Sequence, residues 1–225
     1  MSCLLMQFVA PMQSWGSRSR FQERDTEREP TKSGVLGLVC AAIGRDRKES
    51  IDDLVLLKMG VRVDMEGSVK ADFHTAMNVI KADGSSPDTQ TSSRFYLEDA
   101  VFLVGLEGDV TLLKNIERKL KNPVWPMFFG RKSFVPGKPV YLTDGLLEEP
   151  LELALSSYPS IAPLIIHGLK EEKKLRLVLE CGDNEQGERR QDVPVSFNHG
   201  YRRFITRNVK TIWAQTPKQK DKKCI

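Results

Sequence analysis

The chain has 225 residues, 40% of them hydrophobic and 28% charged, which suits one sizeable core with room for a small appendage. No apolar run approaches the ~20 residues of a membrane helix, and the opening MSCLLMQFVA lacks the basic start of a signal peptide, so we expect a cytoplasmic protein with no membrane partner. The four cysteines are scattered, without a histidine at ligand spacing, which argues against a zinc site and a disulfide framework. We expect no metal and no cofactor.

The net charge of +4 is unevenly distributed along the chain. Residues 201–225 hold eight Lys or Arg and one Asp, a local charge of +7, whereas the rest of the chain sums to −3. A basic end on a weakly acidic body favours a polyanionic partner. The terminal PKQKDKKCI is equally typical of a solvated tail.

The first elements are a strand, a polar loop and a helix. Leu4–Ala10 predicts a short apolar strand, and an Arg-rich loop follows over Gln13–Pro30. PTKSGVLGLVCAAIG predicts a helix that begins near Thr31–Ser33 and ends at Gly44, because Ser or Thr caps a helix start and the apolar residues recur at helical spacing. Ile51–Met59 predicts a second, shorter helical turn.

Two strands and a long polar segment come next. Val61–Asp64 and Asp72–Ile80 predict strands that pair with each other. Lys81–Arg94 (KADGSSPDTQTSSR) has no large apolar residue before its end and is rich in turn residues, so we expect an exposed loop or hairpin tip. Loops of this length are either functional or unstructured, and the segment alone does not decide between the two.

A strand, a helix and a strand complete the first part of the chain. Ala100–Leu106 predicts a buried strand and Val110–Leu120 an amphipathic helix, and a Gly/Pro/basic loop then leads into the strand Val140–Leu142. The order strand, helix, strand, strand, helix, strand is that of the ferredoxin-like fold. We therefore expect an α+β, ferredoxin-like βαββαβ domain over residues 1–145.

The last third of the chain predicts a small β-rich appendage over residues 146–225, without a clear linker. Its expected elements are a helix at Leu151–Ser157 and strands at Leu175–Glu180, Val193–Phe197 and Tyr201–Val209.

The segment from Met12 to Gly37 has the residues of an RNA-binding site. Single-stranded RNA is held by aromatic and guanidinium planes that stack on bases, and by cations and backbone N–H groups that contact phosphates. Trp15 and Phe21 flank two arginines in its loop, and its helix start offers free N–H groups, a favourable dipole and a lysine. Each feature alone is also typical of core packing or of helix capping. The candidates here are Gln13, Trp15, Gly16, Arg18, Arg20, Phe21, Thr31, Lys32, Ser33 and Gly34.

Two later stretches, Gly130–Ser133 and Tyr201–Phe204, again combine basic and aromatic residues. Solvated charges on a turn, or on an exposed strand with Phe204 facing inward, would explain them without a ligand. The candidates for RNA binding in them are Arg131, Lys132, Ser133, Arg202 and Arg203, and Arg207 follows shortly after the second stretch.

The case for an enzyme is weaker. The three histidines, His74, His167 and His199, lie far apart, and no motif of a hydrolase or metalloprotease accompanies them. PTKSG lacks the residue order of a phosphate-binding loop, which argues against nucleotide hydrolysis. Metal-independent RNA cleavage needs a general base and a cation, for which His74 with Lys81 or Tyr96 could serve, but a lone histidine on a strand is more often structural.

These segments together resemble the CasD family of subunits of the type I-E CRISPR Cascade complex. The resemblance rests on FVAPMQSWGSRSRF, PTKSGVLGLVCAAIGR, DFHTA, the polar segment before RFYL, and FFGRKSFVPGKPVYL, in matching order and spacing. It covers residues 3–142 well and the last third loosely, through YRRF and the strand up to Trp213.

The resemblance implies a ferredoxin-like, RRM-related domain with a glycine-rich loop at Gly130–Ser133 and a projecting β-hairpin thumb at about residues 81–94. It implies that Thr31–Gly34 and Gln13–Phe21 line the site for the 5′ handle of crRNA. It also implies that the subunit caps a filament of backbone subunits and contacts the large subunit, with target DNA reached mainly through the assembled complex. His74, Lys81, Arg94 and Tyr96 join the RNA-binding candidates as residues of the thumb region.

Subtype I-C relatives cleave precursor crRNA with Tyr, Lys and His, but this sequence lacks an adjacent Lys-His pair in the corresponding region. The resulting hypothesis is a non-catalytic binder of the crRNA 5′ handle. The alternatives are a metal-independent endoribonuclease and a scaffold that does not contact RNA.

Overall fold

The computed structural model describes residues 1–225 except 18–21, 82, 163–173, 199, 201 and 216–225. Four strands of its main sheet and two long helices form the order strand, helix, strand, strand, helix, strand along the chain. In chain order these elements are β1 (Ser2–Val9), α1 (Lys32–Ile43), β4 (Lys58–Met65), β7 (Val101–Gly108), α3 (Val110–Lys121) and β8 (Tyr141–Leu147). The strands lie in the order β4-β7-β1-β8, each antiparallel to its neighbours, as in the split βαβ arrangement. The expected α+β class is confirmed.

Two apolar cores lie on opposite faces of this sheet. Successive strand residues point to opposite faces, so Leu4, Met6 and Phe8 of β1 join the larger core with α1 and α3, while Cys3 and Leu5 join the smaller one. The smaller core is covered by α4 (Leu151–Ser157), whose bounds match the predicted helix. Both faces of the central strands are therefore buried.

The C-terminal strands extend the main sheet rather than forming an appendage beside it. They are β9 (Lys174–Cys181), β10 (Glu188–Ser196) and β11 (Arg203–Gln215), close to the predicted positions. β9 pairs with β4, and β11 lies between β9 and β10, so one sheet runs as β10-β11-β9-β4-β7-β1-β8. The sequence shows where strands lie but not that Leu179 pairs with Gly60, far back in the chain.

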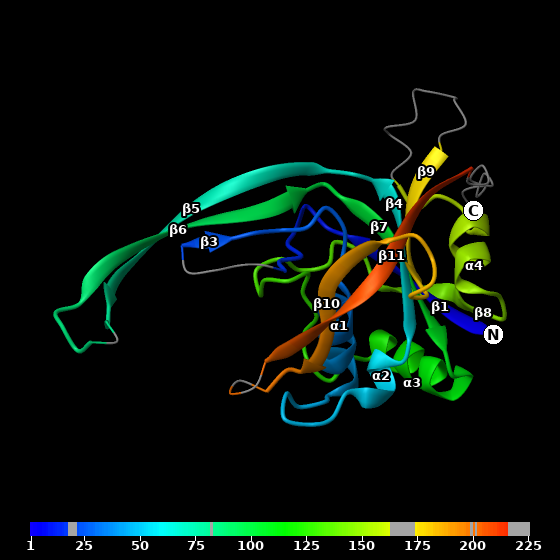
Figure 1. Ribbon diagram of the computed structural model, residues 1–225, viewed down its shortest axis with the longest axis horizontal. Coiled ribbons are helices and arrows are strands. Elements are labelled where there is room, and N and C mark those ends of the chain that lie inside the picture. Colours follow the sequence, from blue (N-terminus) through cyan, green and yellow to red (C-terminus); the bar gives the residue numbers. More distant parts are fainter. Residues whose placement is uncertain (18–21, 82, 163–173, 199, 201, 216–225) are drawn as a thin grey trace.

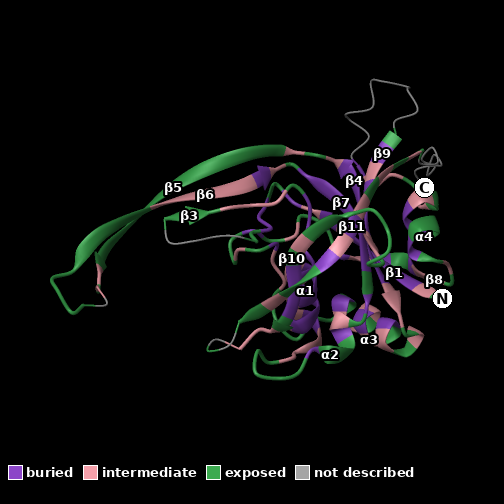
Figure 2. Cartoon of the chain, in the orientation of Figure 1, coloured by how far each residue is buried: buried purple, intermediate pink, exposed green. Residues whose placement is uncertain are grey.

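A two-stranded arm, which we call the thumb, projects from the body (Figure 1). It consists of β5 (Ser68–Val79) and β6 (Asp88–Glu98), and two short strands, β2 (Met12–Gln13) and β3 (Glu23–Arg24), pair with β6 at its base. Figure 2 shows β5 exposed along nearly its whole length and β6 changing from exposed to half-buried, whereas the buried residues gather in the body.

The structure corrects two predictions about this region. β5 pairs with β6 and β4 with β7, so the expected pairing of Val61–Asp64 with Asp72–Ile80 is wrong. Of the predicted loop at residues 81–94, the part from Asp88 on is strand β6. The sequence does not reveal the first half of this strand, because no apolar layer covers it there. Its residues are therefore polar on both faces and lack the alternation of apolar and polar side chains that predicts a strand.

The thumb is a continuation of the β4–β7 hairpin that bends away from the main sheet. At the bend, Gly67 has φ of +69° and Asp99 has φ of +57°, one on each strand. A Cβ atom at Gly67 would lie 2.5 Å from the carbonyl oxygen of Glu98, so this position requires glycine. The bend directs the thumb outward, and β5 and β6 lie in the chain between the two paired strands β4 and β7.

Helix α2 (Asp52–Val55) is shorter than predicted, because the chain from Lys58 onward already pairs with β7 as strand β4. Within the described part of the chain, no helix has the length and apolar character needed to cross a membrane.

Candidate nucleic-acid interface

The start of helix α1 is occupied by the protein's own carboxylates. Thr31 caps the helix as predicted, by accepting a hydrogen bond from the Gly34 N–H (3.3 Å). The Lys32 N–H donates to Asp192 (2.8 Å), and the Lys32 Nζ donates to both carboxylate oxygens of Glu180 (3.0 Å each). Lys32 is only 2% exposed. The prediction that this helix start and Lys32 hold an RNA phosphate is therefore corrected, because Asp192 and Glu180 already take that role.

Arg207 completes this network, which we call the α1 anchor (Lys32, Glu180, Asp192 and Arg207). Its guanidinium donates two hydrogen bonds to Asp192 (2.7 and 2.9 Å) and lies 3.4 Å from Glu180. Arg207 is 9% exposed, so it fixes β11 to β9 and β10 and does not face a ligand. Burial lowers the pKa of Lys32, while the Glu180 carboxylate opposes that shift.

Gln13 and Trp15 also lie inside the protein. The Trp15 ring stacks on Phe8 (centroids 5.5 Å apart) and is 1% exposed, and the Gln13 amide donates to the Ala100 carbonyl (2.8 Å). A Cβ atom at Gly34 would lie 2.8 Å from Trp15 Cε3, so this glycine lets α1 approach the indole. The predicted stacking of Trp15 on a base is thus replaced by packing in the core, the alternative that the sequence left open.

An arginine cluster lies at the thumb base instead. It consists of Arg24, Arg94 and Arg131, from β3, β6 and the loop after α3. β3 runs parallel to β6 and places Arg24 opposite Arg94, and Arg131 donates to the Phe95 carbonyl (2.7 Å) and the Arg24 carbonyl (3.4 Å). Among the residues that the structure describes, no carboxylate lies within ion-pair distance of these three guanidinium groups. The cluster is an excess of positive charge on an accessible surface.

Aromatic rings hold Arg131 in place. Its guanidinium lies over the Phe134 ring (5.2 Å to the centroid), and Phe134 contacts the Tyr96 ring of the thumb (5.8 Å between centroids). Burial and the charge of Arg94 lower the pKa of Arg131 from its ordinary value, Asp72 opposes the shift, and Arg24 lowers the pKa further. Two neighbouring arginines thus disfavour the Arg131 charge, and an anion at this place would relieve that repulsion.

The glycine-rich loop Gly130–Ser133 packs closely against the backbone of Ser14. Gly130 has φ of +88°, and a Cβ atom there would lie 1.8 Å from the Ser14 carbonyl oxygen. Glycine is therefore the residue that allows this approach. Lys132 and Ser133 stand exposed at the loop tip, next to Arg131.

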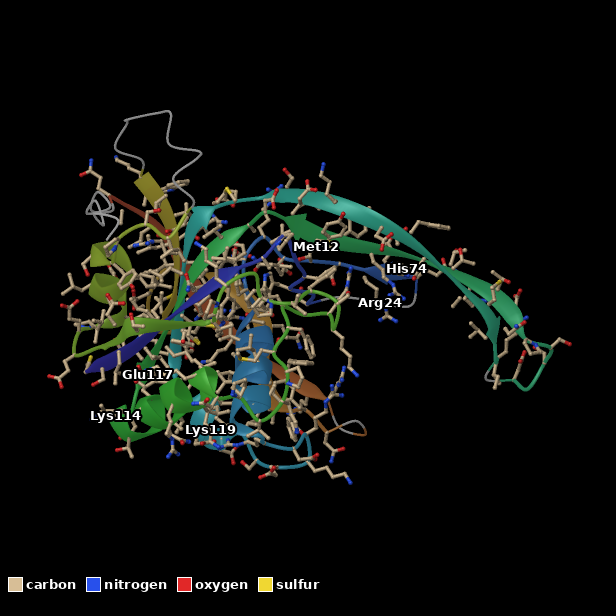
Figure 3. All side chains as sticks on the ribbon, turned by 180° about the vertical axis from the view of Figure 1, so that it is seen from behind. Met12, Arg24, His74, Lys114, Glu117 and Lys119 are labelled. Atoms are coloured by element: carbon tan, nitrogen blue, oxygen red, sulfur yellow. The ribbon has the colours of Figure 1, made fainter. Side chains whose placement is uncertain are left out.

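One face of the thumb continues this polar surface. His74 and Asp72 are in contact there, and the register places them on the same face as Arg94 and Tyr96. Figure 3 shows Arg24, on β3 at the thumb base, near His74 of the thumb. His74 lies opposite Ser92, four residues from Tyr96, or roughly 13 Å along the strand.

The three residues considered for RNA cleavage are consequently spread along the thumb. Lys81 lies beyond the end of β5, where its Nζ is 3.4 Å from an Asp88 oxygen. His74, Lys81 and Tyr96 do not converge on one point. In the described part of the chain, no group of three or more His, Cys, Asp or Glu residues is placed to hold a metal ion.

The other predicted site residues are distributed differently. Arg202 and Arg203 are exposed at the β10–β11 turn, apart from the thumb (Figure 1). Ser33 is half-buried at the start of α1, and Gly16 is exposed in the loop before β3. The predictions for Arg18, Arg20 and Phe21 lie outside the described residues.

Sequence reasoning missed Arg24, Phe134 and Asp72. Arg24 belongs to a run of charges, ERDTERE, in which nothing distinguishes one arginine from the next. Only the parallel pairing of β3 with β6 places it beside Arg94. Phe134 directly follows the basic loop Gly130–Ser133, so the combination of basic and aromatic residues that pointed to this loop could also have pointed to Phe134.

The sequence and the structure of this chain are both similar to those of known proteins. A family model described as "CRISPR-associated protein (Cas_Cas5)" matches residues 3–210. The chain belongs to the Cas5 family of CRISPR-associated proteins. The "CRISPR system Cascade subunit CasD" of Escherichia coli (strain K12) is 28% identical over 174 residues, which are 70% of this chain and 78% of CasD.

Two solved structures resemble the Cas5 chain over nearly its whole length. One, titled "Crystal structure of Cas protein", is 43% identical with a TM-score of 0.75, and covers 95% of each chain. The other, titled "CRISPR RNA-guided surveillance complex", is 32% identical with a TM-score of 0.80, and the match covers 96% of this chain and 91% of that one. The family predicted from the sequence motifs is confirmed.

Proposed function

We propose that the chain is a non-catalytic subunit of a type I-E Cascade complex, which binds and caps the 5′ handle of crRNA. The arginine cluster at the thumb base carries the proposal. Three guanidinium groups without a carboxylate partner among the described residues, beside the aromatic ring of Tyr96, suit the phosphates and bases of single-stranded RNA. The names of the relatives, a Cascade subunit and an RNA-guided surveillance complex, support the same function.

The proposed partners are the crRNA 5′ handle, the backbone subunits and the large subunit of the complex, with target DNA reached mainly through the assembly. Within the RNA surface, Arg24, Arg94 and Arg131 contact phosphates, and Tyr96, Lys132, Ser133 and His74 extend the surface along the loop and the thumb. Lys32 and Arg207 act indirectly, by fixing helix α1 to the sheet.

The test is RNA binding by the double variant Arg24→Gln/Arg94→Gln. We expect its affinity for a guide RNA with the 5′ handle to fall about tenfold at moderate salt, and the slope of log K against log salt to decrease by ~1.4, since two phosphate contacts to a single strand are lost. Fluorescence anisotropy with labelled RNA measures both. Lys58→Gln/Lys174→Gln, which removes two exposed charges from the main sheet, serves as the matched control. An equal loss in this control contradicts the assignment.

The absence of catalysis is tested separately. Because His74, Lys81 and Tyr96 are spread along the thumb, we expect labelled repeat RNA to remain intact when incubated with the purified chain in EDTA. Specific cleavage that disappears in His74→Ala would favour the endoribonuclease instead.

A further inference from the structure

Helix α3 carries a second basic surface, which we call the α3 stripe (Lys114, Arg118 and Lys121, with Lys119 at its side). The three stripe residues are exposed and follow at spacings of four and three residues, so they lie in one line on the outer face of the helix. The opposite face, formed by Leu113, Ile116 and Leu120, is buried. A rise of 1.5 Å per residue spreads the three charges over roughly 10 Å.

The helix itself explains only part of this charge. Cations in a last turn compensate the helix dipole, which accounts for Arg118, Lys119 and Lys121. Lys121 also contacts Glu117 (2.8 Å) and lies over the Tyr141 ring. Lys114 stands near the middle of the helix, where the dipole gives no benefit.

The stripe also works against the stability of its own helix. Lys114 and Arg118 are like charges four residues apart, an arrangement that destabilises an isolated helix. Arg118 donates to the neutral Asn115 (2.9 Å), and within the described residues no carboxylate lies within ion-pair distance of Lys114, Arg118 or Lys119. Glu117 is the one carboxylate of α3 and it contacts Lys121, so the helix keeps an excess of positive charge on its exposed face, which a polyanion outside the chain can balance.

A depression marks one end of the stripe. It has a volume of about 270 Å³ and is lined by Arg118, Lys119 and Asn122. Figure 3 shows Lys114 and Lys119 on α3 at one side of the body, away from Arg24 and His74 at the thumb. The α3 stripe and the arginine cluster are therefore separate surfaces.

We propose that the α3 stripe binds the phosphate backbone of double-stranded nucleic acid. Surfaces for single strands add aromatic rings on which bases stack; α3 contains none, and the Tyr141 ring beside the stripe lies under Lys121. Protein interfaces centre on aromatic and apolar anchors, which the exposed face of α3 also lacks. A duplex offers a dense, regular row of phosphates that cations alone can bind. This contact is independent of the proposed handle site.

The test uses the full chain and a labelled 30-base-pair DNA duplex of arbitrary sequence. The variant Lys114→Gln/Arg118→Gln/Lys119→Gln keeps helix propensity, since glutamine ranks close to lysine and arginine. We expect duplex affinity to fall about tenfold or more, and the slope of log K against log salt to decrease by ~2.7, for three lost phosphate contacts. Circular dichroism checks that the fold and its unfolding midpoint are retained.

A control variant that also loses three positive charges, but elsewhere on the protein, separates the effect of their position from the effect of net charge. Lys58→Gln/Lys174→Gln/Arg189→Gln removes three exposed cations from the main sheet and is expected to lower duplex affinity less than ~twofold. Equal losses in both triple variants, or no loss in the α3 variant, overturn the proposal. Equally strong competition by poly-L-glutamate at the same charge overturns it in favour of an acidic protein partner. Unchanged binding of handle RNA by the α3 variant supports the independence of the two surfaces.

Discussion

The α1 anchor and the arginine cluster at the thumb base differ in how their cations are balanced. The sequence predicts RNA contacts from basic residues of both regions, Lys32 and Arg207 in one, Arg94 and Arg131 in the other. In the α1 anchor, Lys32 and Arg207 face Glu180 and Asp192, so two positive charges meet two negative ones in a buried place. At the thumb base, Arg24 and Arg94 add to the positive charge around Arg131, and the Asp72 carboxylate that opposes them also contacts His74.

The pKa shifts follow the same division. Burial lowers the pKa of both Lys32 and Arg131. Glu180 then raises that of Lys32, whereas Arg94 lowers that of Arg131 further, with Asp72 acting against it. A basic residue in the sequence is thus no guide to ligand binding until its carboxylate partners are known.

The largest expected effect comes from breaking the α1 anchor. Arg207→Met leaves the buried Asp192 without the guanidinium that donates to both of its oxygens. We expect the free energy of unfolding to fall by about 3–5 kcal/mol, the usual cost of removing one partner of a buried ion pair. Urea unfolding followed by circular dichroism measures the change. The double variant Arg207→Met/Asp192→Asn recovers part of the loss if the unpaired charge is the cause; no recovery contradicts that reason.

A smaller effect is expected where a cation has a structural role at the thumb base. Arg131→Gln removes the donor to the Phe95 carbonyl and the contact with the Phe134 ring, which we expect to cost about 1 kcal/mol of stability. Amide hydrogen exchange in β6 becomes faster for the same reason. Arg131→Lys keeps the charge without the planar donor group, so it serves as control: exchange as slow as in the wild type would show that charge alone matters.

The smallest effect on stability belongs to Arg94. Among the residues that the structure describes, its side chain makes one long hydrogen bond, to the Ser92 hydroxyl (3.4 Å), so Arg94→Gln is expected to change the free energy of unfolding by less than ~0.5 kcal/mol. Its affinity for handle RNA should nevertheless fall about threefold to tenfold. Unfolding and anisotropy measurements on the same preparation test the contrast with Arg207. A loss of stability as large as that of Arg207→Met removes the distinction between the two regions.

Much of the fold could be predicted because its signals are local. The caps Thr31 and Gly44 bound α1 as expected, and α4 matches its predicted range, since both ends of a helix depend on nearby residues. The pairing partners of strands were not accessible in this way. The position of β9 beside β4, and of β3 beside β6, depends on contacts between distant segments.

The candidate site was predicted in part for the same reason. Arg131 and Arg94 were found through the basic loop and the thumb motif, whereas Arg24 is placed by strand pairing alone. Trp15 and Lys32 look like ligand-binding residues in a polar stretch. Their burial becomes visible only once Phe8 and Glu180 are known to lie against them.

The α1 anchor also bears on the order in which the chain folds. Lys32 is 148 residues from Glu180 and 160 residues from Asp192. During synthesis the first helix therefore leaves the ribosome long before the strands that fix its start. Contacts of such separation form late, because closing the loop between them costs entropy before it is repaid. The start of α1, with Lys32, therefore stays exposed until the last strands are made. A chain that ended before β9 and β10 would lack Glu180 and Asp192, the carboxylates that fix this helix start.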